Sequence, residues 1–510
     1  MCYLGADSYA FVHRTFLEYF CACEFVEQFG KRGLEGGLTL EELKTEVFGK
    51  HWQDESWHEV LRLITGMIDT SFAGEIVDYL MDLDGAAKKF INLFLGAKCL
   101  SEVRNYLVLE VTATQLLNQL KGLTKYDLNY YYEPYKDQKE TSLVREIRTK
   151  AVAAVATTWK DDPNTLPWLK TLAQSDDDWN VRRAAVQEIA RGWKDNPDTL
   201  PWLKTRVQSD EVGWVQQAAV EEIARGWKDE LDTLCWLKVL AQSTDNLSAR
   251  AAAVRELARG WKNDPDTLPI LKTLAQFDSD WFVRGQATEE LALGWKNDPD
   301  TLTILKSHAL SDENDKERVS SMTRLVNYGW KDDPDTLTIL KTQVLSDEDW
   351  HVRESAVMHL VTGWKDDPES LPILKILALS DDDWNVRRQA LYELLQGWKD
   401  DPQILPILKT CALLDIDWRL RHGAVEELAL GWKDEPWMFD FLCNCALNDP
   451  FERKADWENN PRQLALEIII KQYRDHPQTL PLLRERAEND SDEKVREFAN
   501  KKLEQLERQN

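Results

Sequence analysis

Long hydrophobic runs are missing from this 510-residue chain. No uninterrupted apolar run reaches the roughly 18 residues that a membrane-spanning helix needs. The N-terminal residues 1–7 have no basic region ahead of an apolar stretch, so they lack the pattern of a signal peptide. These absences predict a cytoplasmic protein that neither spans nor binds a membrane.

Cysteine and histidine are few and scattered. The eight cysteines show neither the spacing of a zinc site nor the density of a disulfide framework, and the pairs Cys21/Cys23 and Cys443/Cys445 lie in apolar helical stretches. Packing in a reducing compartment is therefore favoured over metal binding. The eight histidines form no cluster of unlike reactive groups. We expect no metal, no cofactor and no catalytic residue.

Positive charge is in short supply, since 63 Lys and Arg face 89 Asp and Glu for a net charge of −26. Nucleic-acid binders draw most of their non-specific affinity from contacts between cations and phosphates. The charge balance therefore predicts no nucleic-acid partner. The acid recurs in turns such as Ser-Asp-Asp-Asp, which are interpreted as helix caps that keep a long array soluble. Docking of a basic partner on these turns is the alternative.

The chain does contain a strict period. Tryptophans recur at a constant spacing, lengthened by a single residue once, and most stand in Gly-Trp-Lys; they are Trp159, Trp193, Trp227, Trp261, Trp295, Trp330, Trp364, Trp398 and Trp432. A fixed period of this kind, about 34 residues long, indicates one supersecondary unit copied end to end, each copy stacked on its neighbours. It runs from about residue 141 to the C-terminus, which predicts one long array.

One copy predicts a helical hairpin. Residues 197–204, which follow a Pro break, predict the start of a first helix with Thr199 as its N-cap. After an acidic turn, apolar residues at every fourth position from Val181 to Trp193 indicate the buried stripe of a second helix. Gly192 is expected to end that helix. The unit shows no strand pattern.

The second helix opens with Asp-x-x-Val-Arg-x-x-Ala, which resembles HEAT repeats, particularly the short bacterial form also seen in phycobilisome-lyase-like proteins. Tetratricopeptide units have the same length, but their Trp-Leu-Gly-Tyr pattern is missing. The resemblance implies an all-α, right-handed α-solenoid in which Asp and Arg side chains form a ladder between successive repeats. The matching residues are Arg148, Arg182, Arg250, Arg284, Arg353, Arg387, Arg421 and Arg496, with Asp176, Asp210, Asp245, Asp278, Asp347, Asp381, Asp415 and Asp490.

The part of the chain that precedes the array lacks the period. Residues 11–22 read Phe-x-His-x-Thr-Phe-x-Glu-Tyr-Phe-x-Ala, which resembles the motif that ends the winged-helix region of NACHT-type STAND NTPases. In that family the histidine, here His13, can contact the phosphates of bound ADP. The resemblance makes His13 a cofactor-binding residue only within a complete NACHT module.

The sequence contains no phosphate-binding Gly-x4-Gly-Lys-Ser/Thr loop. Residues 48–51 and 85–88 lack both its first glycine and its hydroxyl residue. Any NTPase activity would therefore belong to an upstream module. The expected organisation is a winged-helix remnant over residues 1–30, an irregular helical segment and linker over 31–140, and the repeat array with a terminal cap over 141–510.

Positions whose residue varies among near-identical copies are not required for stacking, so their side chains can be specific for a partner. The second helix begins with tryptophan in five copies, at Trp179, Trp281, Trp350, Trp384 and Trp418, which form the candidate binding surface. Tryptophan is a common interface anchor and also a common staple between adjacent helices; the staple is favoured. Two copies are irregular: one carries an extra residue near 311–318, where the Val-Arg signature is scrambled, and one carries an insertion at 451–456.

The resemblance implies a protein-interaction arm that senses a ligand for a signalling NTPase and catalyses nothing itself. A protein partner on the concave face would relieve an autoinhibited contact with the upstream module. In bacterial relatives the implied setting is signal transduction, including defence against phage. The alternative is a free-standing HEAT scaffold or assembly chaperone of the phycobilisome-lyase-like kind.

Overall fold

The computed structural model describes residues 2–5, 8–10, 14–103, 106–126, 138–243 and 246–507. Their regular structure is helical apart from one antiparallel hairpin, in which β1 (Cys2–Gly5) pairs with β2 (Ser8–Ala10). The all-α prediction is therefore confirmed, with this short hairpin as a local exception. Within the described ranges, no helix is both long and apolar enough to cross a membrane.

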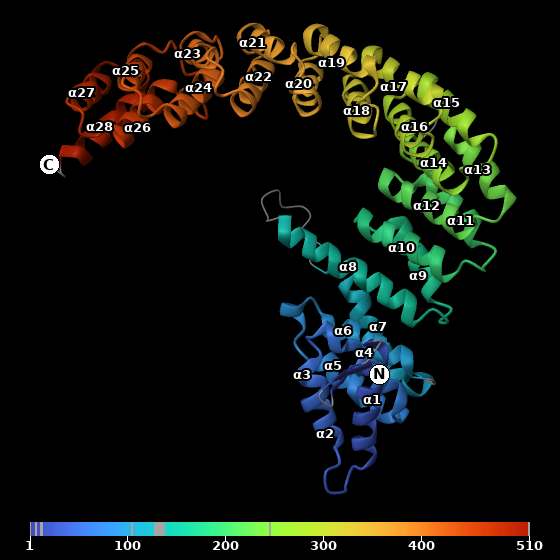
Figure 1. The fold of residues 1–510 in the computed structure, drawn as a ribbon. Coiled ribbons are helices and arrows are strands. Elements are labelled where there is room, and N and C mark those ends of the chain that lie inside the picture. Colours follow the sequence, from blue (N-terminus) through green and yellow to red (C-terminus); the bar gives the residue numbers. More distant parts are fainter. Residues whose placement is uncertain are drawn as a thin grey trace. The chain divides into compact units, whose positions relative to one another are not determined.

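The chain divides into two compact units, residues 1–267 and 268–510. Unit 1 opens with irregular helical structure, blue in Figure 1, around a core that includes the fully buried Leu61, Ile76 and Leu100. Its elements are α1 (Arg14–Gly30), α2 (Leu40–Glu42), the π-helical η1 (Leu43–Phe48), α3 (Gly49–His51), η2 (Glu55–Trp57), α4 (His58–Met67), α5 (Thr70–Asp82), η3 (Ala86–Lys88), α6 (Ile91–Glu102), η4 (Tyr106–Leu109) and α7 (Glu110–Leu123).

Paired helices make up the remainder of unit 1. They are α8 (Gln138–Thr158), α9 (Thr165–Ser175), α10 (Trp179–Gly192), α11 (Thr199–Ser209), α12 (Gly213–Gly226), α13 (Leu231–Ala241) and α14 (Leu247–Gly260). The second helices α10, α12 and α14 pack side by side. The predicted stripe on α10 is buried, with Val181, Ala185 and Ile189 each fully inaccessible to solvent.

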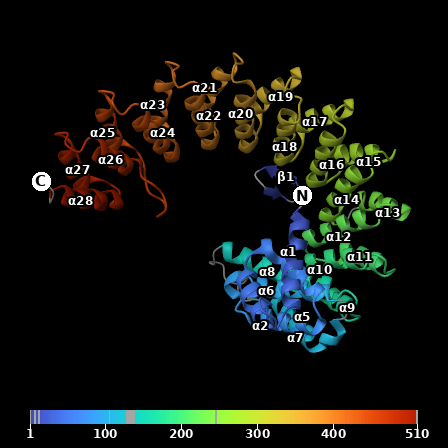
Figure 2. The same ribbon diagram turned by 60° about the horizontal axis from the view of Figure 1, so that its bottom comes forward.

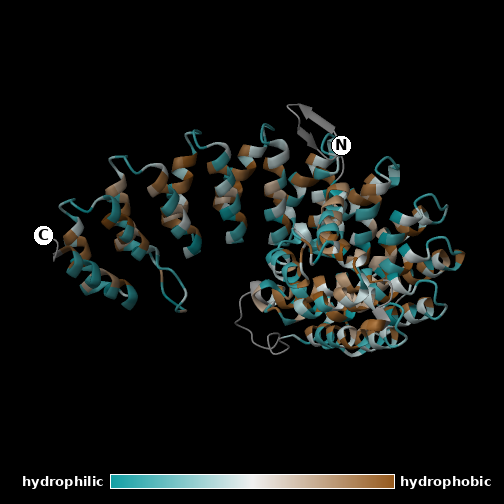
Figure 3. Ribbon diagram, turned by 90° about the horizontal axis from the view of Figure 1, so that it is seen from below, coloured by the Kyte–Doolittle hydropathy of each residue, from teal (hydrophilic) through white to brown (hydrophobic). Residues whose placement is uncertain are grey.

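Unit 2 continues the same pairing. Its helices are α15 (Thr267–Phe277, of which Thr267 belongs to unit 1), α16 (Trp281–Gly294), α17 (Pro299–Ser311), α18 (Asp315–Asn327), α19 (Pro334–Ser346), α20 (Trp350–Trp364), α21 (Ser370–Ser380), α22 (Trp384–Gly397), α23 (Ile404–Leu414), α24 (Trp418–Gly431), α25 (Met438–Asn448), α26 (Pro461–Gln472), α27 (Thr479–Asn489) and α28 (Glu493–Glu507). Figures 1 and 2 show the second helices α18 to α24 on the inner side of a curved row and the first helices on its outer side. The turns are hydrophilic in Figure 3, while a single apolar core runs from Ala292 to Leu506.

One predicted helix start is wrong. Thr199 is the first residue of α11, after its N-cap Asp198, and is fully buried. In several copies the equivalent hydroxyl instead donates to the carbonyl of the repeat's tryptophan, as from Thr336 to Trp330 at 2.8 Å. The predicted end of α10 is confirmed, because Gly192 is its last residue, although its backbone is not left-handed.

The Gly-Trp-Lys motif links one repeat to the next. In unit 2 its lysine lies over the tryptophan ring of the following repeat, with the Lys331 Nζ 5.7 Å from the Trp364 centroid and the Lys365 Nζ 5.4 Å from the Trp398 centroid. A Cβ added at Gly397 would approach the Lys365 Cε at 3.3 Å. The glycine therefore leaves room for the lysine stem, and the cation–π contact stabilises the junction.

Gly329 and Gly192 occupy the same motif position in different backbone conformations. Gly329 has φ +97° and lies against the Lys296 Nζ, whereas Gly192 is helical with open space at its Cβ position. We expect Gly329→Ala to destabilise unit 2 by about 1–2 kcal/mol through backbone strain and the lysine contact. Gly192→Ala is expected to stabilise unit 1 by about 0.4–1 kcal/mol. Thermal unfolding of the two variants measures both changes in stability. Equal changes would contradict the difference in backbone conformation between Gly329 and Gly192.

Candidate protein-interaction surface

A ladder of arginine and aspartate side chains joins successive repeats. Arg387 is typical: its Nε and Nη2 each donate to the Asp415 carboxylate of the next repeat at 2.7 Å, and its Nη1 donates to the Asp381 carbonyl of its own turn at 2.7 Å. The other ladder pairs are Arg148–Asp176, Arg182–Asp210, Arg284–Asp312, Arg318–Asp347, Arg353–Asp381, Arg421–Asp449 and Arg462–Asp490.

The remaining predicted ladder residues that the structure describes are Arg250, Asp278 and Arg496. Arg250 is buried in α14, with 6% of its surface exposed, and the Asp278 carbonyl accepts from the Arg284 Nη1 at 2.9 Å. The Arg496 Nη1 donates to the Asp490 carbonyl. Asp245 and His13 lie outside the described residues, as do positions 127–137 of the predicted segment and linker over 31–140.

The irregular copy keeps the ladder although it reads Glu317-Arg318 in place of Val-Arg. Arg318 binds Asp347 with Nε–Oδ2 at 2.7 Å and Nη2–Oδ1 at 2.9 Å, and the extra residue of this copy lies after Arg318. Sequence reasoning also missed Arg462 and Asp449, which carry the ladder past the insertion. The recurring separation of 28 residues between arginine and aspartate is a signal that could have found both.

Asp312 gives the ladder a pH dependence. Burial favours a higher pKa for Asp312, but the hydrogen bonds and charge of Arg284 outweigh it and hold the pKa below its usual value. The pKa of Asp312 in the folded protein is therefore below that of an unfolded Asp, which is about 3.9. The stability that the Asp312–Arg284 pair adds is complete above the unfolded pKa and is lost as the pH falls through the folded pKa. We expect wild type and Asp312→Asn to differ in urea midpoint by a constant amount near neutral pH. The difference should shrink below about pH 4; a constant difference down to acid unfolding would contradict this.

A second set of charged bridges joins the other ends of the first helices. The Lys341 Nζ lies 2.8 Å from Asp367 and 2.6 Å from Glu369 in the next Pro-containing turn. Lys238, Lys272 and Lys306 make the equivalent pairs of contacts with acids of their following turns. These partly exposed pairs fix register more than they add stability. Acidic turns at both edges thus hold the array together internally.

The five candidate tryptophans begin α10, α16, α20, α22 and α24, and all are half-buried. Each ring is in contact with a neighbouring side chain. The Arg145 guanidinium lies over Trp179 at 5.8 Å, Lys316 over Trp281 at 5.3 Å, and the His351 ring stacks on Trp350 at 3.5 Å. The contacts of Trp179 and Trp281 come from neighbouring helices and favour a stapling role, whereas His351 belongs to the same helix as Trp350.

Trp384 and Trp418 belong to a larger exposed cluster. The Arg419 guanidinium lies 4.8 Å from the Trp384 ring, 5.3 Å from Trp418 and 5.9 Å from Trp457, which directly follows the insertion and is 66% exposed. Arg388 approaches the Trp384 ring at 5.6 Å. One turn further along α22, Tyr392 is 53% exposed and lines, with Arg388 and Arg419, a cavity of about 320 Å³ between α22 and α24. The cluster therefore gathers the side-chain types that dominate protein interfaces.

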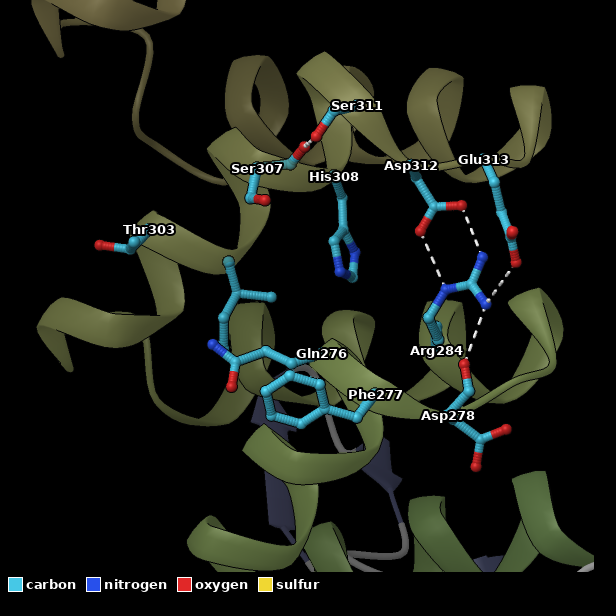
Figure 4. A pocket seen from close by; sticks show the side chains of 11 residues that line it. Gln276, Phe277, Asp278, Arg284, Thr303, Ser307, His308, Ser311, Asp312 and Glu313 are labelled. Carbon is cyan, nitrogen blue, oxygen red and sulfur yellow. Dashed lines mark hydrogen bonds and ion pairs between the residues drawn. The ribbon is translucent and has the colours of Figure 1, made fainter.

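A buried polar network fills the irregular copy. Glu317, 1% exposed, accepts from the Arg324 Nη1 at 2.8 Å and the Ser321 Oγ at 2.9 Å, and lies 3.3 Å from the His308 Nδ1. Arg324 also donates to Glu289 at 2.7 Å. Figure 4 shows His308 pointing into a cavity of about 530 Å³ beside Gln276 and Phe277, opposite the Arg284–Asp312 pair. No spacing rule in the sequence predicted this network.

Three cysteines are buried in the packed interior, whereas Cys235 is exposed. Burial raises the pKa of Cys99, Cys411 and Cys445 to about 12 each, so these thiols stay protonated at neutral pH and are poor nucleophiles and metal ligands. Asp315, Asp349 and His351 form a loose group with ligand atoms within 4.8 Å of one another. Asp349 there caps α20 through the His351 amide at 2.8 Å, which is an ordinary helix start.

The fold of the chain is similar to that of proteins of known structure. Three solved structures are similar over 95% of this chain: a mutant of Kap121p (13% identity, TM-score 0.37), Kap121p bound to RanGTP (14%, 0.40), and Kap95p with RanGDP (14%, 0.40). The similar region spans 56% of each Kap121p chain and 66% of the Kap95p chain. No curated protein matches the chain significantly.

A family model for HEAT repeats matches residues 142–224, 235–323 and 327–395. The match starts within α8 and ends within α22, whereas the Arg–Asp ladder continues to Arg462 and Asp490. The repeats within these ranges are therefore similar to HEAT repeats, and the helical hairpins of the chain stack as an α-solenoid.

Proposed function

We propose that the chain is a protein-interaction scaffold whose partner binds the inner, second-helix side of unit 2, and that it has no catalysis of its own. The exposed cluster of Arg388, Tyr392, Arg419 and Trp457 carries this proposal. Arginine, tyrosine and tryptophan are the residues most enriched among binding hot spots, and a cavity between α22 and α24 offers a place for a partner side chain.

The test compares recovery of partners from the native cells. A tagged protein carrying Arg388→Ala and Tyr392→Ala is expected to retain at least about tenfold less of the partner than wild type, since two exposed anchors are removed. Arg183→Ala is the matched control, because Arg183 occupies in α10 the position that Arg388 occupies in α22. Equal recovery with all three proteins would reject this surface.

A finer proposal places the scaffold in a NACHT-type STAND NTPase as its sensing arm. Its support is the motif at residues 11–22, whose second half forms α1, and the exposure on α1 of Leu17 (50%) and Tyr19 (47%), which an upstream module would cover. Residues 1–30 would then be the end of a winged helix, 31–140 the connecting segment and 141–510 the sensor. Partner binding to the array would relieve an autoinhibited contact with the nucleotide-binding module.

The intact mass of the native protein tests this finer proposal. A mass well above 59.1 kDa, with peptides upstream of Met1 that include a phosphate-binding loop, is expected for the NTPase arm. A mass equal to that of this chain would reject it and leave the free-standing scaffold or assembly chaperone. The partner-binding surface on unit 2 is tested separately and holds in either case.

A further inference from the structure

The last turn of the first helices changes character along the array. The penultimate residue is glutamine in α9, α11 and α15 but leucine in α17, α19, α21, α23 and α25. Four of these leucines are exposed: Leu310 by 44%, Leu345 by 54%, Leu379 by 46% and Leu447 by 39%. In α23 the following residue, Leu414, is exposed by 74%. We call this row, with Ile376 and Ile416, the leucine edge of unit 2.

Stacking of the repeats does not require these leucines. Helices α9 and α11 pack in the same pairs with Gln174 and Gln208 at the equivalent position. Residues that stacking needs are instead buried, as Leu374 and Leu377 are in α21. Exposed apolar side chains thus recur at one position in successive helices, and exposed apolar patches mark interaction sites.

The leucine edge is widest at α21 and α23. Ile376 is 58% exposed, one turn before Leu379, where α9 and α19 carry Thr171 and Thr342. Ile416 is 87% exposed in the turn after α23, where the preceding turns carry Glu348 and Asp382. The middle of the edge has thus exchanged polar and acidic residues for apolar ones.

The flanks of the edge are acidic. The side chain of Glu313 is 80% exposed, and Glu348 and Asp382 are exposed as well. Arg353 and Arg387 donate to the backbone carbonyls of Glu348 and Asp382 and leave their carboxylates to the solvent. Lys306 and Lys341, on the face of the leucines, are each bound to two acids of the next turn. A ligand here meets an apolar row bordered by negative charge.

We propose that the leucine edge binds a basic amphipathic helix of a protein partner. Adjacent packed helices are about 8–10 Å apart, so five successive first helices present apolar side chains over roughly 40 Å. Seven residues of an α-helix rise about 10.5 Å, so a helix of about 28 residues with one apolar residue per heptad matches the row. Lysines or arginines beside that apolar stripe would meet Glu313, Glu348 and Asp382. This surface is on the first helices and is independent of the proposed second-helix site.

The probe is a dye-labelled synthetic helix of about 28 residues with leucine at one position of each heptad and lysine beside it. Its Kd for the full chain is measured by fluorescence anisotropy at low and high salt. The double variant Leu345→Gln/Leu379→Gln, which installs the residue of α9 and α11, is expected to weaken binding at least about tenfold. Glu348→Gln/Asp382→Asn should weaken it about threefold at low salt and flatten the salt dependence. Val239→Thr removes an exposed apolar residue from α13 of unit 1 and should change nothing.

Three outcomes would overturn the proposal. The probe could fail to bind wild type, or bind the leucine variant as well as wild type, which would mean a non-specific attraction to the acidic chain. The third outcome concerns a second copy of this chain. If light scattering shows a wild-type dimer that Leu345→Gln/Leu379→Gln separates into monomers, the edge is a self-association surface instead.

Discussion

Arg387→Ala is expected to lower the free energy of unfolding of the repeats around α22 and α24 by about 3–5 kcal/mol. The arginine side chain is 5% exposed and the Asp415 side chain 7% exposed, so removal of the guanidinium leaves a buried carboxylate without its cation. The carbonyls of Asp381 and Asp382 lose their donor as well. Hydrogen exchange of the amides in α22 and α24 measures the loss directly.

The neighbouring residue provides the control. Arg388 has a side chain that is 54% exposed and pairs only at 3.7 Å with Glu354, so Arg388→Ala should change stability by less than about 0.5 kcal/mol. Arg387→Lys should fall between the two, because an ammonium keeps the charge but not the two-pronged contact with Asp415. Equal exchange rates in the Arg387→Ala and Arg388→Ala proteins would show that the ladder does not stabilise the array.

Glu317→Ala is expected to destabilise unit 2 by about 3 kcal/mol, at the lower end for a broken buried ion pair. The lower value follows because Arg324 keeps its contacts with Glu289 and the Gly285 carbonyl. His308 and Ser321 lose an acceptor in a region with almost no solvent. Urea unfolding of the variant and of wild type measures the change.

A double replacement distinguishes the stability that the network contributes from the destabilisation caused by an unpaired buried charge. Glu317→Leu with Arg324→Met removes both charges and fills similar volume, so it should recover most of the stability lost in Glu317→Ala. Glu289, which is 29% exposed, then remains solvated. If the double variant is no more stable than the single one, the network itself contributes to stability through its hydrogen bonds.

The repeat could be predicted from the sequence because its signals are local and copied many times. The tryptophan period, the fourfold apolar spacing and the Asp-x-x-Val-Arg pattern each predict helix pairs, and the ladder pairs have the residues that the HEAT resemblance named. The starts of the second helices at Trp384 and Trp418 also agree with the sequence. The predicted N-cap failed, because Thr199 is buried as the first residue of α11 and Asp198 is the N-cap.

Contacts between repeats were largely beyond prediction. The Lys341 bridge, the lysine over the next tryptophan and the Glu317 network all join residues whose proximity depends on how helices stack. The leucine edge could have been noticed in the sequence, since glutamine gives way to leucine at a fixed position. Its significance needed exposure values, because an apolar residue in the last turn of a helix is ordinarily taken as core.

Three recurring sets of links between repeats share one direction. Ladder arginines, bridging lysines and the lysines of Gly-Trp-Lys all reach from one repeat to acids or rings of the following one. During synthesis the N-terminal repeats emerge first. Each newly folded repeat would then present cations that have no counterpart until the next repeat leaves the ribosome. The last folded repeat of a nascent array thus presents unpaired arginines and lysines on an otherwise acidic protein. Each added repeat supplies acids and rings for those cations and presents new unpaired cations of its own.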